Sequence, residues 1–283
     1  MNKFTTIQEI KSWRQKIFGS IGFVPTLGAL HAGHLSLVKK SLQHCDLTIV
    51  SIYLNPTQFS SDEDLESYPN TLEMDLKKIA ELSVDTVFLP SNSEMYPDGF
   101  TTFVGESYLS KTLEGKSRLG HFKGVSTIVA KLLNIVQPSE VFFGEKDAQQ
   151  FRIIQKMIQD LNFPVEIVSC PTIREKSGLA MSSRNAYLSP EDLKSAAIIN
   201  KALIEGKNLL RSGEKDADVI RNRISKIISI ESGISVDYVS VADSSTLKEI
   251  PGEIIDTVLV SVAVYLGKTR LIDNFIYPSS SSK

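Results

Sequence analysis

Cysteine, histidine and long apolar runs are all scarce in this sequence. The 283 residues include two cysteines and four histidines. Cys45 and Cys170 lie far apart, and neither belongs to a CxxC pair. We therefore interpret both as small buried apolar residues of a protein that works in a reducing compartment.

No stretch approaches the ~20 apolar residues that span a bilayer, and residues 1–14 are polar and amphipathic, unlike a signal peptide. The formal net charge of −2 provides no long-range attraction to nucleic acid or to an anionic membrane, so local groups must bind any polyanion. The chain also lacks a Ser/His/Asp or Cys/His set typical of covalent catalysis. These absences predict a cytoplasmic protein with no nucleic-acid or membrane partner.

The residues that are present predict an α/β fold. Hydrophobic residues make up 42% and charged residues 23%, which is ordinary for a globular protein. Short β-branched apolar runs alternate with stretches of helical spacing, which predicts a Rossmann-like, doubly wound and mainly parallel sheet. The predicted strands are residues 20–24, 47–53, 84–89, 140–143 and 165–168, and the predicted helices are 35–44, 71–82, 124–136 and 148–161.

The alternation of strands and helices ends near residues 175–188, where we place a domain boundary. Two helices over 191–210 and 217–232 and strands over 235–241, 257–266 and 270–274 predict a smaller C-terminal α+β domain with antiparallel pairing. The predicted domains are therefore 1–176 and 177–283, followed at 278–283 by a serine-rich tail that we expect to be disordered. Asn70 and Ser189 are predicted helix N-caps, because each has a carboxylate three residues later.

The most informative motif follows the first predicted strand and reads Pro25-Thr26-Leu27-Gly28-Ala29-Leu30-His31-Ala32-Gly33-His34. Two histidines three residues apart would suit half of a zinc site, but no third ligand with metal spacing is evident. Alternatively, the glycines let the backbone approach a phosphate, and a helix beginning near His34 would direct its N–H groups and dipole at the anion. Imidazoles there could donate to phosphate oxygens.

Three further motifs follow later strands or lie at the domain boundary. The string Asn55-Pro56-Thr57-Gln58-Phe59, with Asp62 and Asp64 after it, is compatible with a turn or with a site where Gln58 offers a donor and an acceptor. Gly144-Glu145-Lys146-Asp147 places a mobile cation for phosphate next to a carboxylate suited to ribose. Met181-Ser182-Ser183-Arg184 combines hydroxyl groups and a guanidinium into an anion-binding set.

Two other strings carry less weight. Arg118-Leu119-Gly120-His121-Phe122-Lys123-Gly124-Val125 puts a basic cluster at a helix start, where binding of an anion and a purely structural loop are equally compatible. Gly267-Lys268-Thr269 resembles the end of a P-loop, but Val262 stands where that motif needs glycine, and the string lies between two strands. We expect a hairpin turn there.

Together these strings resemble the pantothenate synthetase (pantoate–β-alanine ligase) family, which belongs to the nucleotidyltransferases with the HIGH signature. Residues 25–38 carry the likeness most specifically, and the resemblance covers essentially the whole chain. Leu27 departs from the methionine that is common in the family, and Leu119 departs from a proline.

The resemblance implies that ATP and (R)-pantoate form pantoyl adenylate, which β-alanine converts to pantothenate and AMP. It assigns catalysis to His34, His31 and Lys146, and binding of pantoate or β-alanine to Gln58, Gln150 and Asn55. It implies Mg²⁺ bound with ATP, no tightly bound organic cofactor, a homodimer, and a C-terminal domain that closes over ATP. The ATP-binding residues that it implies are Leu27, Gly28, Ala29, Leu30, His31, Ala32, Gly33, His34, Gly144, Glu145, Lys146, Asp147, Ile173, Met181, Ser182, Ser183 and Arg184.

Three other functions remain open from the sequence. An adenylyltransferase that acts on a phosphorylated cofactor precursor would share the HxGH turn but should lack Gln58 and Gln150 in this arrangement. A metal-dependent hydrolase would need a third protein ligand besides His31 and His34. A nucleotide-binding module without activity should have lost His34, Lys146 or Arg184, and all three are present.

Overall fold

The computed structural model describes residues 1–60 and 63–279, which form two compact units. Unit 1 comprises Met1–Glu145 and Gln149–Pro171, and unit 2 comprises Lys146–Ala148 and Thr172–Lys283. Each unit has its own sheet and its own buried core. Asp62 of the second motif and residues 280–283 of the predicted tail lie outside the described residues.

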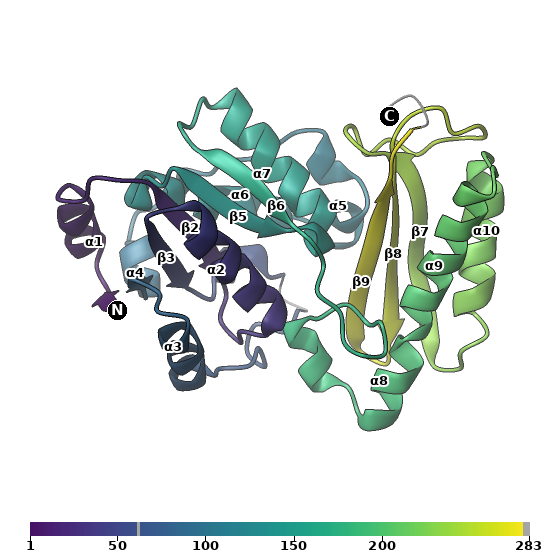
Figure 1. Ribbon diagram of the computed structural model, residues 1–283, viewed down its shortest axis with the longest axis horizontal. Coiled ribbons are helices and arrows are strands. Elements are labelled where there is room, and N and C mark those ends of the chain that lie inside the picture. Colours follow the sequence, from purple (N-terminus) through teal and green to yellow (C-terminus); the bar gives the residue numbers. More distant parts are fainter. Residues whose placement is uncertain (61–62, 280–283) are drawn as a thin grey trace. The chain divides into compact units, whose positions relative to one another are not determined.

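Unit 1 is built on a six-stranded parallel sheet in the order β1-β4-β3-β2-β5-β6 (Figure 1). Its strands are β1 (Asn2–Phe4), β2 (Ile21–Thr26), β3 (Leu47–Ile52), β4 (Thr86–Phe88), β5 (Glu140–Gly144) and β6 (Glu166–Cys170). Its helices are α1 (Ile7–Arg14), α2 (Ala32–His44), α3 (Leu72–Glu81), α4 (Asn92–Met95), α5 (Glu114–Ser117), α6 (His121–Val136) and α7 (Ala148–Asp160). Short 3₁₀ turns lie at η1 (Pro56–Gln58), η2 (Leu109–Lys111) and η3 (Glu145–Asp147).

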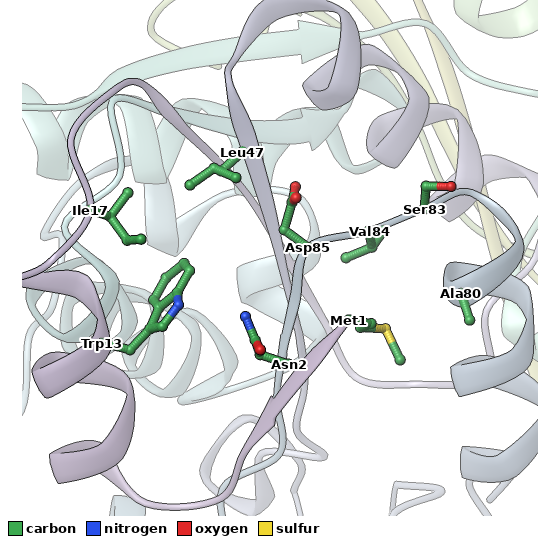
Figure 2. Close-up of a pocket in the computed structure, with 9 residues that line it drawn as sticks. All are labelled: Met1, Asn2, Trp13, Ile17, Leu47, Ala80, Ser83, Val84 and Asp85. Atoms are coloured by element: carbon green, nitrogen blue, oxygen red, sulfur yellow. The ribbon is translucent and has the colours of Figure 1, made fainter.

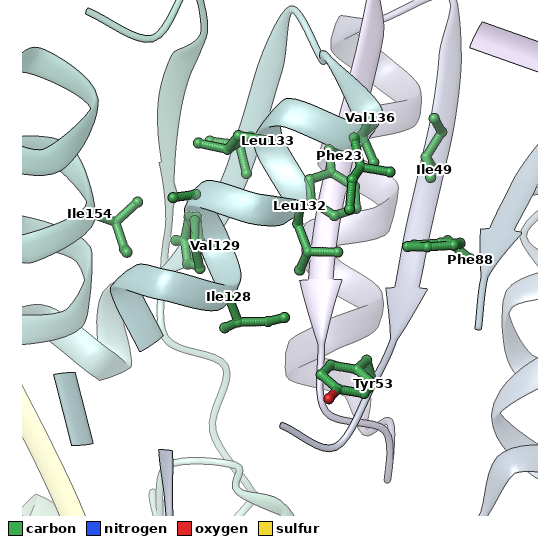
Figure 3. Packing of buried hydrophobic residues seen from close by; sticks show 14 of the residues in the cluster. Phe23, Ile49, Tyr53, Phe88, Ile128, Val129, Leu132, Leu133, Val136 and Ile154 are labelled. Carbon is green, nitrogen blue, oxygen red and sulfur yellow. The ribbon is translucent and has the colours of Figure 1, made fainter. Parts of the chain in front are cut away.

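Neighbouring residues of a strand point to opposite faces of the sheet. Both faces of this sheet carry apolar side chains, and helices cover both. Phe23 of β2 and Ile49 of β3 pack with side chains of α6 and α7 in one buried cluster (Figure 3), which also includes Ile10 of α1. Their neighbours Val24 and Val50 pack with α2 and α3 in another cluster. The predicted doubly wound parallel sheet is therefore confirmed.

Unit 2 contains an antiparallel sheet in the order β7-β8-β9, with helices packed on it. The strands are β7 (Ile234–Asp243), β8 (Val258–Leu266) and β9 (Thr269–Tyr277), and the helices are α8 (Pro190–Ala196), α9 (Ile198–Arg211) and α10 (Ala217–Ile228), preceded by η4 (Ser183–Tyr187). In Figure 1, α9 and α10 lie side by side against the three strands. The predicted α+β character and antiparallel pairing are confirmed, and Gly267 and Lys268 form the turn between β8 and β9 as expected.

Four local predictions need correction. The first strand, β1, was missed because it has only three residues and pairs at the sheet edge with β4. Helix α2 begins at Ala32 rather than near His34, because His31 is its N-cap. The cap of α3 is Thr71 rather than Asn70, and it makes no side-chain cap hydrogen bond. The stretch predicted as one helix over 191–210 forms α8 and α9, which meet at Ala197.

The cap predicted at Ser189 is confirmed. Its hydroxyl accepts from Asp192 N at 3.1 Å, and the Asp192 carboxylate accepts from Ser189 N at 3.4 Å. Pro190 occupies the first helical position, where its missing N–H has no intrahelical partner to lose. This start of α8 lies just beyond η4, which includes Ser183 and Arg184, so it fixes where the chain leaves that segment.

Gly124 provides a stability test, because α6 crosses the backbone of η1 at this residue. A Cβ on Gly124 would lie 2.2 Å from Thr57 O and 2.6 Å from Gln58 N. Alanine usually stabilises a helix interior by ~1 kcal/mol over glycine, but here backbone overlap outweighs that gain. We expect Gly124→Ala to lower the free energy of unfolding by about 2 kcal/mol or more, measured by denaturant melts.

Gly105→Ala is the matched control for this test. Among the described residues no atom lies within 4 Å of a Cβ built on Gly105, and its backbone needs no glycine conformation. Its stability should therefore stay close to wild type. Equal melting midpoints for the two variants would contradict a close approach at Gly124.

Candidate functional site

The strand order of unit 1 reverses at β2, and the sequence motifs follow strands at that point. The chain runs from β2 to β3 and β4 on one side of the sheet, and β5 and β6 lie on the other side. In open α/β sheets, ligands bind beyond the carboxyl ends of the strands at such a switch point. The segments that follow β2, β3 and β5 carry Gly28–His34, Asn55–Gln58 and Gly144–Asp147.

A cavity of about 550 Å³ lies elsewhere in unit 1 (Figure 2). Its lining includes Asn2, Leu47 and Asp85, which stand at or just before the first residues of β1, β3 and β4. It is therefore at the amino ends of the strands, the edge opposite to the motifs. We exclude it from the candidate site for this reason.

The turn after β2 has an unusual backbone. Gly28 has φ 92°, and Ala29 also lies in the left-handed region with φ 51°. A non-glycine residue there is uncommon and is retained only where the surroundings enforce it. The Thr26 hydroxyl contributes by accepting from Gly28 N at 3.3 Å while donating to Ser51 O at 2.8 Å.

Two side chains of α3 hold the next residue of this turn, and sequence reasoning missed both. The fully buried Asp75 carboxylate accepts from Leu30 N at 2.9 Å and from the Thr71 hydroxyl at 3.0 Å. Lys78 donates to Leu30 O at 2.5 Å. The available signal was a carboxylate on the same helix face as buried Ile79, where an apolar residue is expected.

His31 and His34 lie together at the start of α2, and their backbone contacts define their tautomers. His31 Nδ1 accepts from Gly33 N at 3.1 Å, and His34 Nδ1 accepts from His31 N at 3.4 Å. In neutral imidazole the other ring nitrogen then carries the proton. Both rings, with centroids 4.1 Å apart, therefore present an Nε2–H donor near a helix N-terminus, which suits a phosphate.

Gln58 is the last residue of η1, and Asn55 is the residue just before η1. Gln58 is 8% exposed, and its amide oxygen accepts from Asn55 Nδ2 at 3.0 Å. Asn55 is fully buried and also donates to Gly124 O at 3.3 Å. Gln58 is thus the member of the pair with surface left for a ligand.

The loop of Arg118 and His121 lies next to Gln58. His121 Nδ1 is 2.8 Å from Gln58 O, and Arg118 Nη1 is 2.9 Å from His121 Nε2. Arg118 also forms a two-pronged ion pair with Glu63, with N–O distances of 2.6 and 2.9 Å. The basic cluster in that string therefore has a structural role beside a predicted substrate residue.

Gln149 and Gln150 lie in the first turn of α7 and differ in what their side chains do. Gln149 is buried, donates to Leu109 O at 2.6 Å and to Thr112 O at 2.8 Å, and accepts from Glu114 N at 2.9 Å. That set of bonds is structural. Gln150 is only partly buried, so it stays the candidate for substrate binding.

In unit 2, Lys146 is attached to β9 through its backbone. Asn274 Nδ2 donates to Lys146 O at 2.8 Å, and Lys146 Nζ lies 3.4 Å from Asp147 Oδ1. The Lys146 side chain is largely buried, with 18% of it exposed. Asn274 therefore fixes the backbone from which this predicted phosphate ligand extends.

The segment that carries Ile173 and Met181 is attached to the same strand. Met181 N donates to Ile173 O at 2.9 Å, which closes a hairpin. Arg174 in that hairpin forms a two-pronged ion pair with Asp273, which is 2% exposed and lies next to Asn274. Ser182 then caps η4 by accepting from Arg184 N at 3.3 Å, so Ser182, Ser183 and Arg184 follow one another around a single tight turn.

The described residues give no support for a metal site, a cysteine nucleophile or a membrane-spanning helix. Within residues 1–60 and 63–279, no group of three or more His, Cys, Asp or Glu side chains is placed to hold a metal ion. Burial raises the pKa of both Cys45 and Cys170 to about 11, so each thiol is protonated at neutral pH and is a poor nucleophile. No helix in the described part of the chain is long and apolar enough to cross a membrane.

Comparison with known proteins gives a consistent family. Residues 2–276 match the family model described as pantoate-beta-alanine ligase. The chain belongs to this family. Pantothenate synthetase from Acetivibrio thermocellus is 52% identical over 279 residues, covering 98% of this chain and 99% of the relative. The pantothenate synthetase from Thermosipho africanus is 49% identical over 280 residues, with 98% and 100% covered.

Solved structures of the family agree with the fold. A pantothenate synthetase from Thermus thermophilus superposes with a TM-score of 0.92 at 38% identity, covering 97% of this chain and 99% of that one. A pantoate-beta-alanine ligase from Francisella tularensis, complexed with beta-gamma ATP and beta-alanine, has a TM-score of 0.79 at 37% identity, with 98% and 97% covered. The sequence-based family assignment is therefore confirmed.

Asp75 offers a test of how the turn after β2 is held. Asp75→Ala would leave the buried Leu30 N–H without its acceptor, at a cost of about 2 kcal/mol in the free energy of unfolding. We also expect a higher KM for ATP, because the turn that precedes His31 loses its anchor. Denaturant melts and steady-state kinetics measure the two effects.

The control for Asp75 is Glu73→Ala, an exposed carboxylate in the first turn of the same helix. It should change neither stability nor kinetics appreciably. A loss of stability in Asp75→Ala with an unchanged KM for ATP would show that the turn does not depend on this anchor.

Proposed function

We propose that this enzyme condenses (R)-pantoate with β-alanine at the expense of ATP, giving pantothenate, AMP and diphosphate through a pantoyl adenylate. The observation that carries the proposal is the family match over residues 2–276, in a chain whose motif segments follow the strands around the switch point of a parallel sheet. The Francisella relative, complexed with beta-gamma ATP and beta-alanine, supports the same substrates.

The first step joins pantoate to AMP. A pantoate carboxylate oxygen attacks the α-phosphorus of ATP, the bond to the β-phosphate oxygen breaks, and diphosphate leaves. No protein nucleophile is needed, so the protein contributes positioning and stabilisation of charge. In the second step the β-alanine amine attacks the acyl carbon, AMP leaves with the electron pair of the broken acyl–oxygen bond, and the new amide nitrogen gives up a proton to solvent.

The side chains of each unit suit parts of this reaction. In unit 1, we assign the turn Leu27–Gly33 to ATP, the Nε2–H groups of His31 and His34 to phosphate oxygens, and Gln58 and Gln150 to pantoate. In unit 2, Lys146, Ser182, Ser183 and Arg184 provide donors and positive charge for the departing diphosphate, Asp147 is assigned to ribose, and Ile173 and Met181 to the adenine side. Gly144 and Glu145 complete the assignment to ATP.

Gly144 fits a ligand role on a specific observation. Its backbone does not need glycine, and among the described residues no atom lies within 4 Å of a Cβ built on it. Packing within the protein therefore does not explain this glycine, whereas a closely approaching nucleotide would. Mg²⁺ bound with ATP would neutralise part of the charge of the triphosphate.

Three expectations remain predictions from the sequence: a homodimer, a cytoplasmic location, and closure over ATP of the C-terminal domain formed by residues 177–283. Light scattering of the purified protein measures the first, and a monomer mass would count against it. Protection of the Met181–Arg184 segment from hydrogen exchange on adding ATP would support closure.

The proposed reaction is tested by mixing the enzyme with Mg-ATP, pantoate and β-alanine. We expect AMP to form only when both the acid and the amine are present, and diphosphate to be released in equal amount. ATP consumption that does not depend on pantoate would refute the proposed substrate. Formation of AMP with other hydroxy acids but never with pantoate would retain the adenylate chemistry and reject the specific acid.

His34 should act mainly in the transition state. Removing one donor to a developing charge typically lowers kcat 10²–10³-fold, so we expect a loss on the order of 10² in His34→Ala with little loss of folding stability. His34→Gln, whose amide nitrogen can approximate the Nε2–H position, should recover part of the rate.

The matched control for His34 is His44→Ala. His44 lies at the other end of α2, is 35% exposed and pairs with Glu140. Its removal should leave kcat unchanged. A large drop of the melting temperature in His34→Ala, with no recovery of rate in His34→Gln, would indicate a structural histidine instead.

A further inference from the structure

Asn55 lies at the centre of a hydrogen-bond network that fixes one end of Gln58. Its side chain is fully buried, and its amide nitrogen donates to Gln58 Oε1 at 3.0 Å and to Gly124 O at 3.3 Å. The hydroxyls of Tyr96 and Thr57 lie 2.8 and 3.0 Å from its amide oxygen. An asparagine amide has two donor hydrogens and one acceptor oxygen, so every polar atom of Asn55 has a protein partner.

The orientation of Asn55 follows from chemistry. Gly124 O is a carbonyl and can only accept, so the Asn55 nitrogen must face it. A turned amide would direct its oxygen at that carbonyl and its nitrogen at the hydroxyl groups. The Asn55 nitrogen therefore also faces Gln58, and the partner atom on Gln58 must be its oxygen.

The orientation of Gln58 decides which group it can offer to a ligand. Because its Oε1 faces Asn55, its NH₂ group is directed away from Asn55 and is the end that a substrate can meet. Gln58 therefore acts as a hydrogen-bond donor, which suits a carboxylate or hydroxyl oxygen. With the opposite orientation it would repel a carboxylate.

We propose that Tyr96 is a positioning residue for pantoate: through Asn55 it holds the Gln58 amide with its NH₂ group toward an oxygen of the acid. This inference rests on the proposed function and adds the means by which the acid is oriented. Asn55, predicted from the sequence as a substrate ligand, then acts through Gln58 rather than by touching the substrate.

Tyr96 is suited to this role because its ring is independently held. The ring packs edge-on against Phe100 with centroids 5.0 Å apart, and Lys131 Nζ lies 5.8 Å from its centroid. Burial raises the pKa of Tyr96, so the hydroxyl keeps its proton and stays a donor. Removal of the hydroxyl alone should therefore leave the ring in place.

A second contact holds the backbone of Gln58. His121 Nδ1 must donate to Gln58 O, which can only accept, and His121 Nε2 must then accept from the Arg118 guanidinium. The ion pair between Arg118 and Glu63 anchors that guanidinium. The main chain of Gln58 is thus fixed from the start of α6, which leaves its side-chain orientation to Asn55, whose amide oxygen accepts from both Tyr96 and Thr57.

Tyr96→Phe tests the proposal. A neutral hydrogen bond typically contributes about 1 kcal/mol, or roughly fivefold in an equilibrium constant, so we expect the KM for pantoate to rise about 5- to 10-fold. The KM for ATP, and kcat at saturating pantoate, should stay within about twofold of wild type because the network orients only Gln58, which we assign to pantoate. The melting temperature is measured on the same samples.

Tyr53→Phe is the matched control. Tyr53 is buried and Tyr96 is partly buried, but the Tyr53 hydroxyl donates to Asn92 Oδ1 at 2.8 Å rather than to Asn55. Its variant should leave all three kinetic constants unchanged. An equal rise of the pantoate KM in both variants would show a general packing effect and overturn the proposal.

A double-mutant cycle shows whether Tyr96 acts through Gln58. In a Gln58→Ala background, Tyr96→Phe should produce no further change in the pantoate KM, because the amide that it orients is gone. If the two effects multiply instead, Tyr96 acts by another route and the proposal is wrong.

The wild-type reaction in the same assay tests the proposed function separately. Pantoate-dependent AMP formation by wild type, combined with an unchanged pantoate KM in Tyr96→Phe, would reject only the positioning role. Absence of pantoate-dependent AMP formation in wild type would reject the proposed function, and the positioning of pantoate with it.

Discussion

The approach of α6 to the η1 segment at Gly124 is the constraint on which the candidate substrate site depends. Without a side chain, Gly124 lets the backbone of Thr57 and Gln58 lie directly against the helix. Its carbonyl group also accepts from Asn55 and so selects the orientation of that amide. A single residue therefore sets both the distance between two elements and the polarity of the groups that lie between them.

Unit 2 also depends on a small number of residues, because two consecutive residues of β9 support two different segments. Asp273 pairs with Arg174 of the hairpin that leads to Met181, and Asn274 binds the carbonyl of Lys146. Both side chains are buried, so a shift of β9 would move both segments together. One strand, β9, therefore holds in place both segments that carry the groups assigned to ATP in this unit.

The features that the sequence predicted well are those with local signals. Strand and helix periodicity predicted the parallel sheet, and the motif strings marked the residues that follow β2, β3 and β5. The Ser189 cap was predictable because its partner Asp192 is three residues away. Asn70 and Thr71 are both residue types that can cap a helix, and the local pattern predicted the wrong one of the two.

The supporting residues could not be predicted in the same way, because their partners are distant in the chain. Tyr96 and Asn55 are 41 positions apart, and Asn274 and Lys146 are 128 apart. No periodicity connects such pairs, and a tyrosine before a proline reads as an ordinary loop residue. Asp75 left a weak trace, since a carboxylate on an apolar helix face needs a buried partner. That trace indicates a bond without naming Leu30 as the other end.

The two thiols have a practical consequence for studying this enzyme. Cys170 is buried as expected, whereas Cys45 is only partly buried, which corrects the expectation for that residue. Thiolates, not thiols, react with maleimides and iodoacetamides, and a pKa of about 11 leaves few thiolates at neutral pH on either Cys45 or Cys170. A cysteine introduced at an exposed position such as Leu119, which is 82% exposed, would escape the burial that raises the two native pKa values and would react far faster. Fluorescent or spin labels could therefore be attached selectively without first removing the native cysteines.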